Sequence, residues 1–575
     1  MARTVKIGNQ DFGEIIGRNC FYVDKTGFIK EWWENEDDVT LITRPRRFGK
    51  TLNMSMLNYF FSINHKGDSH LFEGLDIWRS KKYRELQGTY PVIYLSFAGV
   101  KQTNYKNTRK YICKLITNLY LDYRFLIDEG FLRGVDITFF NSVMPDMDDV
   151  DAAESLKQLS KYLSKYYGKK VIILLDEYDT PMQEAYVNGY WDEMADFTRG
   201  LFNSAFKTNP YLERAIMTGI TRVSKESVFS DLNNLEVITT TSPKYETAFG
   251  FTEKEVQESL SEFGLQDKMA EVKRWYDGFQ FGKCDSIYNP WSITNFLDVR
   301  QFAPYWANSS SNALIGKLIQ EGGREIKTRV ENLINGASFM ASLDEQIVFS
   351  QLSENEDAIW SLLLASGYLK VINLYDVDYE SGKGFATYEL MLTNLEAAFV
   401  FRKMISGWFA VCSAPYNHFI QALLQNNLTE MNRYLNNVAM MIASNFDSGK
   451  KPSEYTAPEK FYHGLVLGLI LELRDTYVIT SNRESGYGRY DLLLEPRNLT
   501  DEGIILEFKV VAPETEKGLD DTAQAAIRQI INKKYAVTLE EKGISREKVR
   551  IYGFAFRGKE VFIDGGYLND FVIPV

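Results

Sequence analysis

Short runs of apolar and β-branched residues, bounded by polar residues, recur in the N-terminal part of the chain. They comprise Val39–Ile42, Pro91–Phe97, Val171–Leu175 and Ala215–Gly219. Such runs are typical of strands buried on both faces, as in a parallel sheet covered by helices. Because ligands bind such sheets at the carboxyl ends of the strands, the polar residues that follow these runs are candidates for a binding site. The pattern predicts an N-terminal α/β fold.

The first run leads into RPRRFGKT at residues 44–51, and a segment compatible with a helix follows. Strand, loop and helix N-terminus in this order predict a P-loop, in which Gly49 lets backbone N–H groups approach phosphate oxygens. Lys50 would reach the β- and γ-phosphates, and the Thr51 hydroxyl would complete the shell of Mg²⁺. The alternative is a basic surface turn. We expect the whole loop to bind nucleotide: Arg44, Arg46, Arg47, Phe48, Gly49, Lys50, Thr51 and Leu52.

Asp176 and Glu177 follow the third run and supply the partner motif of a P-loop. We expect Asp176 to hold Mg²⁺ through water and Glu177 to polarise the water that attacks the γ-phosphate. Thr218 closes the strand beside them and is a candidate γ-phosphate sensor. Arg222 and Lys225, in the next loop, could face phosphate or be ordinary solvated cations. ATP and Mg²⁺ are therefore the expected cofactors.

Two further apolar runs, Tyr490–Leu494 and Gly503–Phe508, flank a polar turn and predict a hairpin. Glu507 and Lys509 are two residues apart and share one face of the second strand, while Asp491 stands at the start of the first. This D…E-x-K set is typical of a restriction-endonuclease-like site, where two carboxylates hold a divalent cation and the lysine stabilises developing charge. The bare pattern also fits an amphipathic hairpin.

Several longer motifs point to one protein family. NQDFGEIIGRNCFYVDKTGFI, TRPRRFGKTLNMSML, LLDEYDTP, MTGITRVSKESVFSDLNN and WYDGFQFG resemble segments of bacterial AAA-ATPase-like proteins with a C-terminal PD-(D/E)XK nuclease-like domain. The resemblance implies that Arg44 in place of the usual glycine is a family trait. It also implies an ATP-dependent prokaryotic protein that acts on DNA or RNA in defence or mobile-element biology. The alternative is a nucleotide-switched regulator or scaffold with an inactive nuclease-like domain.

A chain of 575 residues is too long for a single hydrophobic core. We predict an AAA-like P-loop ATPase domain at 1–235, a helical lid and connecting, winged-helix-like region at 236–450, and a PD-(D/E)XK nuclease-like, restriction-endonuclease-like α/β domain at 451–575. Inside the middle region, Thr252 and Glu255 predict the capping box of a helix, and residues 368–392 predict a hairpin. Asp277 and Asn289 could contact nucleotide or fix turns.

Charge and composition narrow the range of partners. The formal charge is −12, and residues 455–575 contain 16 Lys and Arg against 19 Asp and Glu. The C-terminal domain therefore lacks the basic character usual in nucleic-acid-binding proteins, and DNA or RNA would need a locally basic face. Widely separated cysteines, no signal-peptide pattern and no long apolar stretch predict a cytoplasmic protein without a membrane partner. A homo-oligomer is compatible with the sequence.

Overall fold

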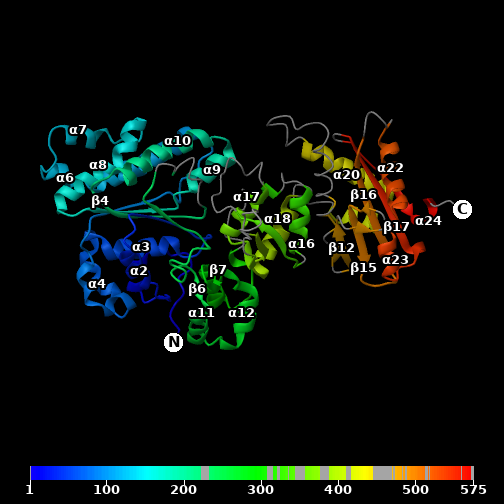
Figure 1. Ribbon diagram of the computed structural model, residues 1–575, viewed down its shortest axis with the longest axis horizontal. Helices are drawn as coiled ribbons and strands as arrows, with labels where there is room; N and C mark the ends of the chain where they lie inside the picture. The colour runs from blue at the N-terminus through cyan, green and yellow to red at the C-terminus, as the bar shows by residue number, and fades with distance from the viewer. Residues whose placement is uncertain are drawn as a thin grey trace, which may run out of the picture. The chain divides into compact units, whose positions relative to one another are not determined.

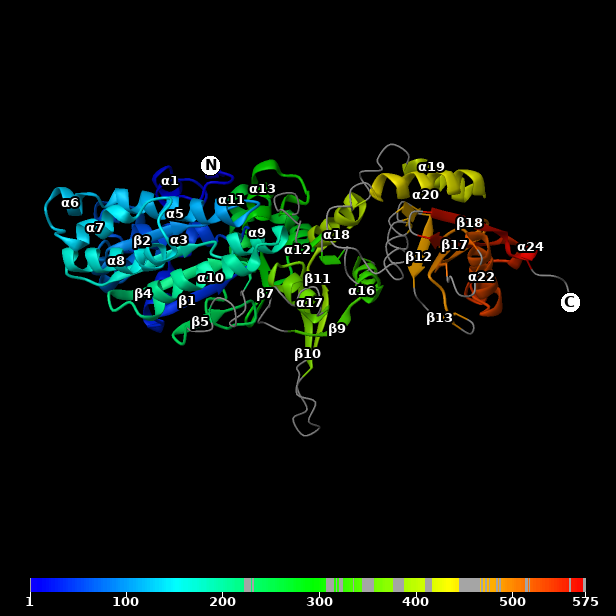
Figure 2. The same ribbon diagram turned by 90° about the horizontal axis from the view of Figure 1, so that it is seen from above.

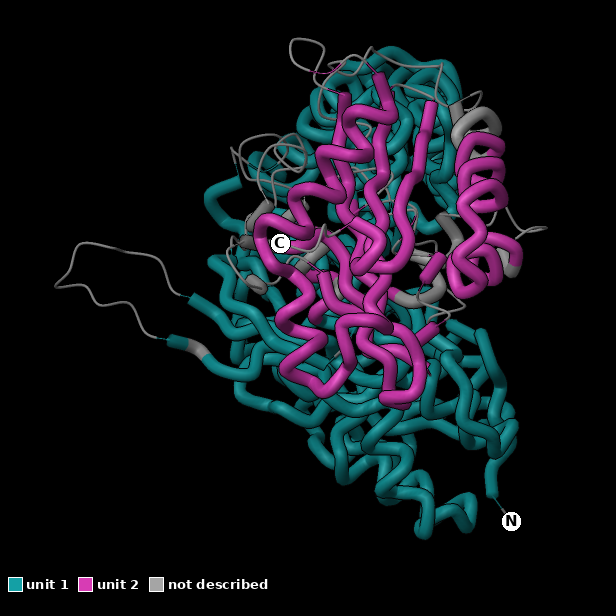
Figure 3. Tube along the Cα trace, turned by 90° about the vertical axis from the view of Figure 1, so that its right-hand side faces the viewer, with its two compact units in different colours: residues 1–318, 333–400 teal, residues 319–332, 401–575 magenta. Residues whose placement is uncertain are grey.

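The structure is a computed structural model of the 575-residue chain, and it divides into two compact units. The first comprises residues 1–318 and 333–400, and the second comprises residues 319–332 and 401–575 (Figure 3). The structure describes residues 2–221, 229, 232–306, 315–316, 318–319, 324–334, 336–343, 356–375, 387–408, 416–443, 466, 469–470, 473–474, 476–481, 484–485, 488–511, 516, 518–557 and 560–571.

A five-stranded parallel sheet forms the centre of the first unit, with the strand order β2-β3-β4-β1-β5. Every residue of β1 and β3 is buried, as expected for a sheet covered on both faces. The four apolar runs form β1 to β4, which confirms the predicted parallel sheet. The strands are β1 (Val39–Thr43), β2 (Val92–Ser96), β3 (Val171–Asp176), β4 (Leu212–Gly219) and β5 (Leu235–Ile238).

Helices lie on both faces of this sheet, with α2, α3 and α4 on one side and α8 and α10 on the other (Figure 1). Strand β4 lies between β1 and β3, so the ends of these three strands meet at one edge of the sheet. The helices are α1 (Phe12–Gly17), α2 (Gly27–Asn35), α3 (Lys50–Phe61), α4 (Lys81–Leu86), α5 (Tyr105–Asp122), α6 (Phe125–Asp128), α7 (Val135–Ser142), α8 (Asp149–Tyr167), α9 (Thr180–Asn188) and α10 (Trp191–Phe202).

The rest of the first unit adds two small sheets and more helices. Thr252 caps α11 and forms a capping box with Glu255, as predicted. Asn289 caps α13, because its side-chain oxygen accepts hydrogen bonds from the backbone N–H groups of Trp291 and Ser292 at 2.9 and 3.3 Å. The elements are β6 (Phe251–Thr252), α11 (Glu253–Phe263), α12 (Met269–Tyr276), β7 (Phe279–Phe281), β8 (Cys284–Tyr288), α13 (Pro290–Val299), β9 (Phe339–Ser342), α17 (Glu356–Ala365), β10 (Leu369–Tyr375) and β11 (Thr387–Leu392).

Strands β9, β10 and β11 form a small sheet beside α17 (Figure 2). The antiparallel pair β10–β11 confirms the hairpin expected at 368–392. Six consecutive residues of α17, 358–363, are buried, so this part of the helix is covered on all sides. This arrangement is compatible with a winged-helix-like module that packs within the unit. Two helices, α16 (Arg324–Ile334) and α18 (Leu395–Trp408), contain residues assigned to both units.

A second five-stranded sheet, in the order β12-β15-β16-β17-β18, forms the centre of the second unit. The pair β16–β17 is parallel and the other pairs are antiparallel, so the sheet is mixed. Leu492 faces Leu506 in the pair β15–β16, which confirms the predicted hairpin. Helix α22 packs against β16 and β17. The strands are β12 (Tyr477–Ser481), β13 (Glu484–Ser485), β14 (Gly488–Arg489), β15 (Leu492–Pro496), β16 (Gly503–Val510), β17 (Val549–Arg557) and β18 (Glu560–Tyr567).

Helix α20 covers the edge strand β18 through two asparagines. The Asn432 side chain donates to Ile563 O at 2.8 Å and accepts from Ile563 N at 2.7 Å. The Asn436 side chain donates to Val561 O at 2.6 Å and accepts from Val561 N at 3.0 Å. Asn432 and Asn436 are four residues apart on a helix, a rise of about 6 Å, and Val561 and Ile563 are two residues apart on a strand, a rise of about 6.7 Å. The two asparagines can therefore pair with alternate residues of β18. The helices of this unit are α19 (Tyr416–Leu424), α20 (Leu428–Ala443), α22 (Leu519–Asn532), α23 (Val537–Glu541) and α24 (Leu568–Phe571).

The division into two units cuts the chain differently from the three predicted domains, because α19 and α20 are grouped with the C-terminal sheet. The three-domain division stays a prediction. Among the helices in the described part of the chain, none combines the length and the apolar character that crossing a bilayer requires.

Candidate nucleotide and metal sites

A cavity of about 400 Å³ lies over the loop that joins β1 to α3. Its wall includes the loop residues Gly49, Lys50 and Thr51, the carboxylate residue Glu177, and apolar residues of the N-terminal segment such as Val5. Gly49, the N-cap of α3, adopts the left-handed conformation with φ of 81°. The first N–H groups of α3 come directly after it and have no partners within the helix. A cavity of this size suits a small-molecule ligand such as a nucleotide.

The Lys50 ammonium is buried at the base of this loop. It donates hydrogen bonds of 2.8 Å to the backbone oxygens of both Arg44 and Pro45. Burial lowers the pKa of Lys50, while the carboxylates of Glu177, Asp179 and Asp176 act in the opposite direction. The lysine is therefore a cation in a desolvated position, which strengthens its attraction for an incoming phosphate.

Asp176 lies at the end of β3 with both carboxylate oxygens bound by hydroxyl groups. Thr51 donates to Oδ2 at 2.8 Å and Thr218 donates to Oδ1 at 2.6 Å. Asp176 is fully buried, and this burial raises the pKa of its carboxyl group. The structure thus brings together the predicted metal residues Thr51 and Asp176. A hydroxyl and a carboxylate are hard oxygen ligands of the kind that suit Mg²⁺.

Glu177 follows Asp176 and lines the cavity. Its backbone adopts the left-handed conformation with φ of 51°, which is uncommon for a residue with a side chain and often marks functional sites. Its N–H donates to the Thr218 hydroxyl at 3.3 Å, and its carboxylate accepts from the Thr180 hydroxyl at 3.2 Å. Thr218 therefore contacts both acidic residues, which places the predicted sensor between them.

The structure places Arg44 in the core, away from the cavity. Its guanidinium donates to the backbone oxygens of Thr43 at 2.9 Å and Thr239 at 2.7 Å, and it lies 4.5 Å from the centroid of the Phe281 ring. Arg44 is fully buried, and desolvation lowers its pKa. These oxygens belong to the last residue of β1 and to the residue that follows β5, and buried backbone oxygens need hydrogen-bond donors. We therefore replace the predicted phosphate contact of Arg44 with this structural role.

The other loop residues divide by position. Arg46 and Arg47 line the cavity, and Arg47 lies 4.2 Å from the centroid of the Trp291 ring. Burial lowers the pKa of Arg47. The Phe48 ring is buried against Phe279, so this residue offers mainly its backbone to a ligand. Leu52 also lines the cavity.

The two cations expected in the next loop, Arg222 and Lys225, lie outside the described residues. Asp277 accepts a hydrogen bond from the Ser286 hydroxyl at 3.1 Å, which fits a turn.

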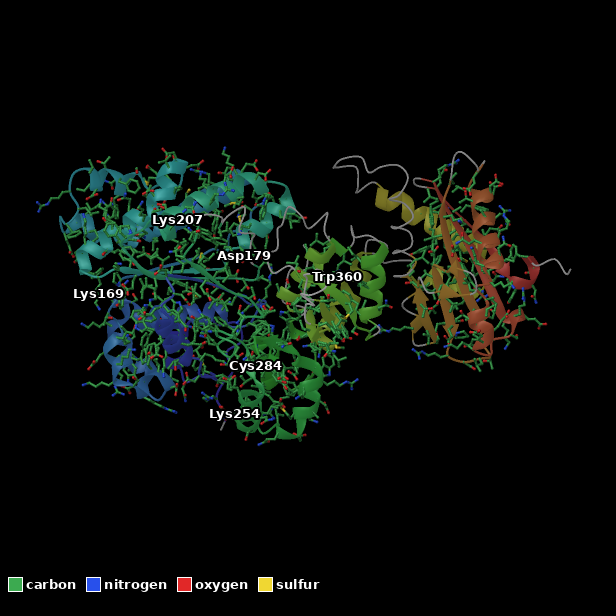
Figure 4. All side chains as sticks on the ribbon, in the orientation of Figure 1. Lys169, Asp179, Lys207, Lys254, Cys284 and Trp360 are labelled. Carbon is green, nitrogen blue, oxygen red and sulfur yellow. The ribbon has the colours of Figure 1, made fainter. Side chains whose placement is uncertain are left out.

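Asp179 and its partner Gln183 lie near this site and were not identified as site residues from the sequence. Asp179 is buried, and its Oδ2 accepts hydrogen bonds of 2.9 Å from the N–H groups of Ile220 and Thr221 and of 2.8 Å from the Gln183 amide. Figure 4 labels Asp179 at the end of the sheet, near the start of α9. The only signal in the sequence is its place in DEYD, three residues after Asp176.

The second unit brings Asp491, Glu507 and Gln529 together. Glu507 Oε2 accepts a hydrogen bond of 3.2 Å from the backbone N–H of Asp491, and Asp491 Oδ2 accepts one of 2.9 Å from the N–H of Phe508. The side-chain amide of Gln529, on α22, donates to Glu507 Oε1. Asp491 and Glu507 are 5% and 4% exposed, so each carboxylate binds the backbone of the other strand segment in a nearly buried position.

Lys509 follows Glu507 on β16, two residues along, so both side chains leave the same face of the strand. The predicted set thus sits at one end of the hairpin. Paired carboxylates are hard ligands that fit Mg²⁺, although the described residues contain no group of three or more His, Cys, Asp or Glu that would form a complete metal cage. A cation held by Asp491 and Glu507 would keep several water ligands.

Two protein-family models match parts of the chain. Residues 6–229 match the family described as "Predicted AAA-ATPase", and residues 457–565 match the PD-(D/E)XK nuclease superfamily. The chain carries an AAA-ATPase-like domain and a PD-(D/E)XK nuclease-like domain. The resemblance drawn from the sequence motifs is thereby confirmed. The AAA-ATPase-like match includes β1 to β4 with the cavity loop, and the nuclease-like match includes β12 to β17 with α22.

Relatives add little about activity. The "Uncharacterized protein in vnfD 5'region" of Azotobacter chroococcum mcd 1 is 28% identical over 322 residues. These residues are 56% of this chain and 56% of that protein, so the chain spans little more than half of its relative. A solved structure of the Aeropyrum pernix ORC2 protein, in ADPNP-ADP complexes, matches 66% of this chain and 92% of its own, at 10% identity and a TM-score of 0.23.

Proposed function

We propose that the AAA-ATPase-like domain binds and hydrolyses ATP. The observation that carries the proposal is the contact set around Asp176, whose two carboxylate oxygens accept hydrogen bonds from Thr51 and Thr218 beside the cavity. Thr51 belongs to the P-loop and Thr218 to the neighbouring strand, so the set joins three elements that a phosphate-binding site requires.

The residues around the cavity support this reaction. Lys50 would exchange its bonds to two backbone oxygens for oxygens of the β- and γ-phosphates. The N–H groups at the start of α3 would bind the same phosphates, which the helix dipole favours. A Mg²⁺ ion held near Thr51 and Asp176 would neutralise phosphate charge. Glu177 lines the cavity and would accept the proton of the attacking water.

We further propose that the PD-(D/E)XK nuclease-like domain cleaves phosphodiester bonds in DNA or RNA under the control of ATP. Its support is the approach of Asp491 and Glu507 in a nearly buried position at one end of a hairpin. A divalent cation held there would polarise the scissile phosphate. Lys509 would stabilise the charge that develops on it. A role in prokaryotic defence or mobile-element biology rests on the family resemblance alone.

A single set of assays tests both activities. The purified 575-residue chain is incubated with Mg²⁺ or Mn²⁺ and a panel of duplex and single-stranded DNA and RNA, with and without ATP, while released phosphate is measured. We expect phosphate release that depends on Lys50 and Glu177, and cleavage that depends on Asp491 and Lys509. Phosphate release that persists in both Lys50→Ala and Glu177→Gln proteins would overturn the ATPase proposal.

A second function has an observation of its own. Each carboxylate of the C-terminal pair already accepts a hydrogen bond from within the domain, and Glu507 also accepts one from Gln529. A cation must compete with these bonds. Residues 455–575 also carry more acidic than basic side chains. Both features favour the alternative, a nucleotide-switched regulator whose nuclease-like domain binds a partner without cutting. ATP turnover without cleavage of any nucleic acid would support it.

A further inference from the structure

Gln183, on α9, joins two groups of opposite charge near the cavity. Its Oε1 accepts a hydrogen bond from Arg46 Nη2 at 3.2 Å, and its Nε2 donates one to Asp179 Oδ2 at 2.8 Å. Arg46 lines the cavity, whereas Gln183 stands behind Arg46 and is not part of the cavity wall. Gln183 can therefore reach a ligand only through Arg46.

The chemistry of the three side chains fixes the orientation of the amide. A guanidinium only donates and an ionised carboxylate only accepts, so the amide oxygen must face Arg46 and the amide nitrogen must face Asp179. Glutamate at position 183 would keep the first bond and repel Asp179. An apolar residue would lose both bonds. The bridge thus depends on a neutral side chain that has a donor and an acceptor at this length.

Asp179 connects this bridge to the loop that follows β4. Its Oδ2 also accepts hydrogen bonds from Ile220 N and Thr221 N at 2.9 Å and from the Thr221 hydroxyl at 3.0 Å. Gly219 lies so close to Asp179 that an added Cβ would come within 2.8 Å of Asp179 Oδ1. The same strand carries Thr218, which contacts Asp176 and the Glu177 N–H.

Arg46 and Glu177 both line the cavity. Its partner Gln183 is on the helix that begins at Thr180, and Thr180 itself binds the Glu177 carboxylate. The charge of Arg46 also acts on Lys50, since it contributes to lowering the pKa of the lysine. An arginine close to both the phosphate-binding lysine and the residue expected to polarise water is placed for the terminal phosphate.

We propose that Gln183 is a positioning residue that holds Arg46 at the γ-phosphate of ATP and connects that contact to the loop after β4. The inference rests on the proposed nucleotide site. A long arginine side chain loses rotamer freedom when it binds phosphate, and a bond that fixes it beforehand reduces this loss. Because ADP has no γ-phosphate, the bridge should raise the affinity for ATP over that for ADP.

Gln183→Met tests this with little disturbance, because methionine has a similar length and a similar helix propensity but cannot bridge the two charges. Calorimetric titration of the 575-residue chain with ADP and with a non-hydrolysable ATP analogue gives the ratio of the two affinities. We expect Gln183→Met to lower the affinity for the analogue about fivefold, because Arg46 then loses its rotamer freedom only on binding phosphate, and to leave ADP binding within about twofold. Gln257→Met, at an exposed position of α11, is the matched control and should change neither.

Arg46→Met should reproduce the selective loss, and the double variant Arg46→Met with Gln183→Met should lose no more than Arg46→Met alone, since both act through one contact. Equal losses for both nucleotides, an additive double variant, or no loss at all would overturn the role of Gln183 while the nucleotide site stands. A parent protein that binds neither nucleotide would overturn the proposed function itself.

Discussion

The Thr51 hydroxyl donates a hydrogen bond of 2.8 Å to the carboxylate of Asp176, across 125 positions of sequence. This contact links the first turn of α3 to the end of β3, and it pairs a hydroxyl with a buried charge. A buried carboxylate is costly unless hydrogen bonds or a cation compensate for the lost water. Burial raises the pKa of Asp176, and its hydrogen bonds from Thr218 and Thr51 oppose this change only in part, so the stability of the ligand-free protein should depend on pH.

We expect Asp176→Asn to be more stable than the parent at pH 7 when no nucleotide is present. Burial raises the pKa of Asp176 above its usual 3.8, so the folded protein pays an energetic cost for the charged form once the pH exceeds the raised pKa. Asparagine cannot ionise and avoids this cost. The Tm difference should shrink as the pH falls toward 3.8. The Tm difference is measured by thermal unfolding at several pH values. The transition to follow is the one that shifts when ATP is added, because it reports on the ATPase-like domain.

Asp285→Asn, at an exposed position of β8, is the control and should show no such dependence. An Asp176→Asn protein that melts below the parent at pH 7 would contradict the account. The stabilised variant should also lose ATP hydrolysis, because it lacks the metal-binding carboxylate. Such a gain of stability with a loss of activity is common where a site keeps an unfavourable charge for its function.

Lys50→Ala and Glu177→Gln should fail at different steps of one reaction. The first removes the buried ammonium at the phosphate position, and we expect ATP affinity to fall at least tenfold. The second keeps the cavity and removes only the base, so binding should persist while kcat falls about a hundredfold or more. Nucleotide titration and phosphate release distinguish the two. Lys254→Ala, on the solvent side of α11, is the control.

Asp491→Ala and Lys509→Ala should abolish any cleavage of nucleic acid and leave ATP turnover at the parental rate, because these residues lie in the second unit and the ATP cavity in the first. Asp491→Ala should also weaken Mn²⁺ binding to that unit, whereas Lys509→Ala should not. Asp501→Ala, in the exposed turn between β15 and β16, serves as the control. Cleavage that survives Asp491→Ala would show that the hairpin site is not the nuclease centre.

The strands around the cavity were predictable because their apolar runs are continuous and end in polar residues. That Thr51, Asp176 and Thr218 lie together was predictable for this reason, since the ends of β1, β3 and β4 meet in a parallel sheet. Asp491 and Glu507 could likewise be placed near each other, because only a short hairpin turn separates their strands. Their roles in binding and catalysis stay predictions.

Arg44 and Gln183 were beyond this reasoning, because their partners are remote in sequence. The partners of Arg44 include the backbone oxygen of Thr239, 195 positions away. Every residue has a backbone oxygen, so no residue type in the sequence indicates such a partner. Gln183 resembles any polar residue on a helix until Arg46, 137 positions earlier, is placed beside it. The roles of Arg44 and Gln183 thus depend on tertiary contacts, which the sequence pattern does not reveal.

Replacing Asn432 and Asn436 together by alanine should destabilise the second unit, because each amide satisfies one N–H and one C=O of β18. A buried backbone group without a partner costs about 1–3 kcal/mol, so we expect a loss of about that size for each position. Denaturant unfolding measures it. Asn437→Ala, exposed on the same helix, is the matched control and should cause no loss of stability, because alanine has the higher helix propensity. Equal losses in both proteins would contradict the pairing.

The asparagine pairing on β18 also decides where the C-terminal part can be cut out for separate study. The nuclease-like match begins at residue 457, after α20 has ended at Ala443. A fragment that starts there keeps Asp491 and Glu507 but leaves a row of unpaired backbone groups along β18, which is a template for another strand. Such a fragment should self-associate and give misleading results in binding assays. A fragment that begins before Tyr416 retains α19 and α20 and should stay monomeric.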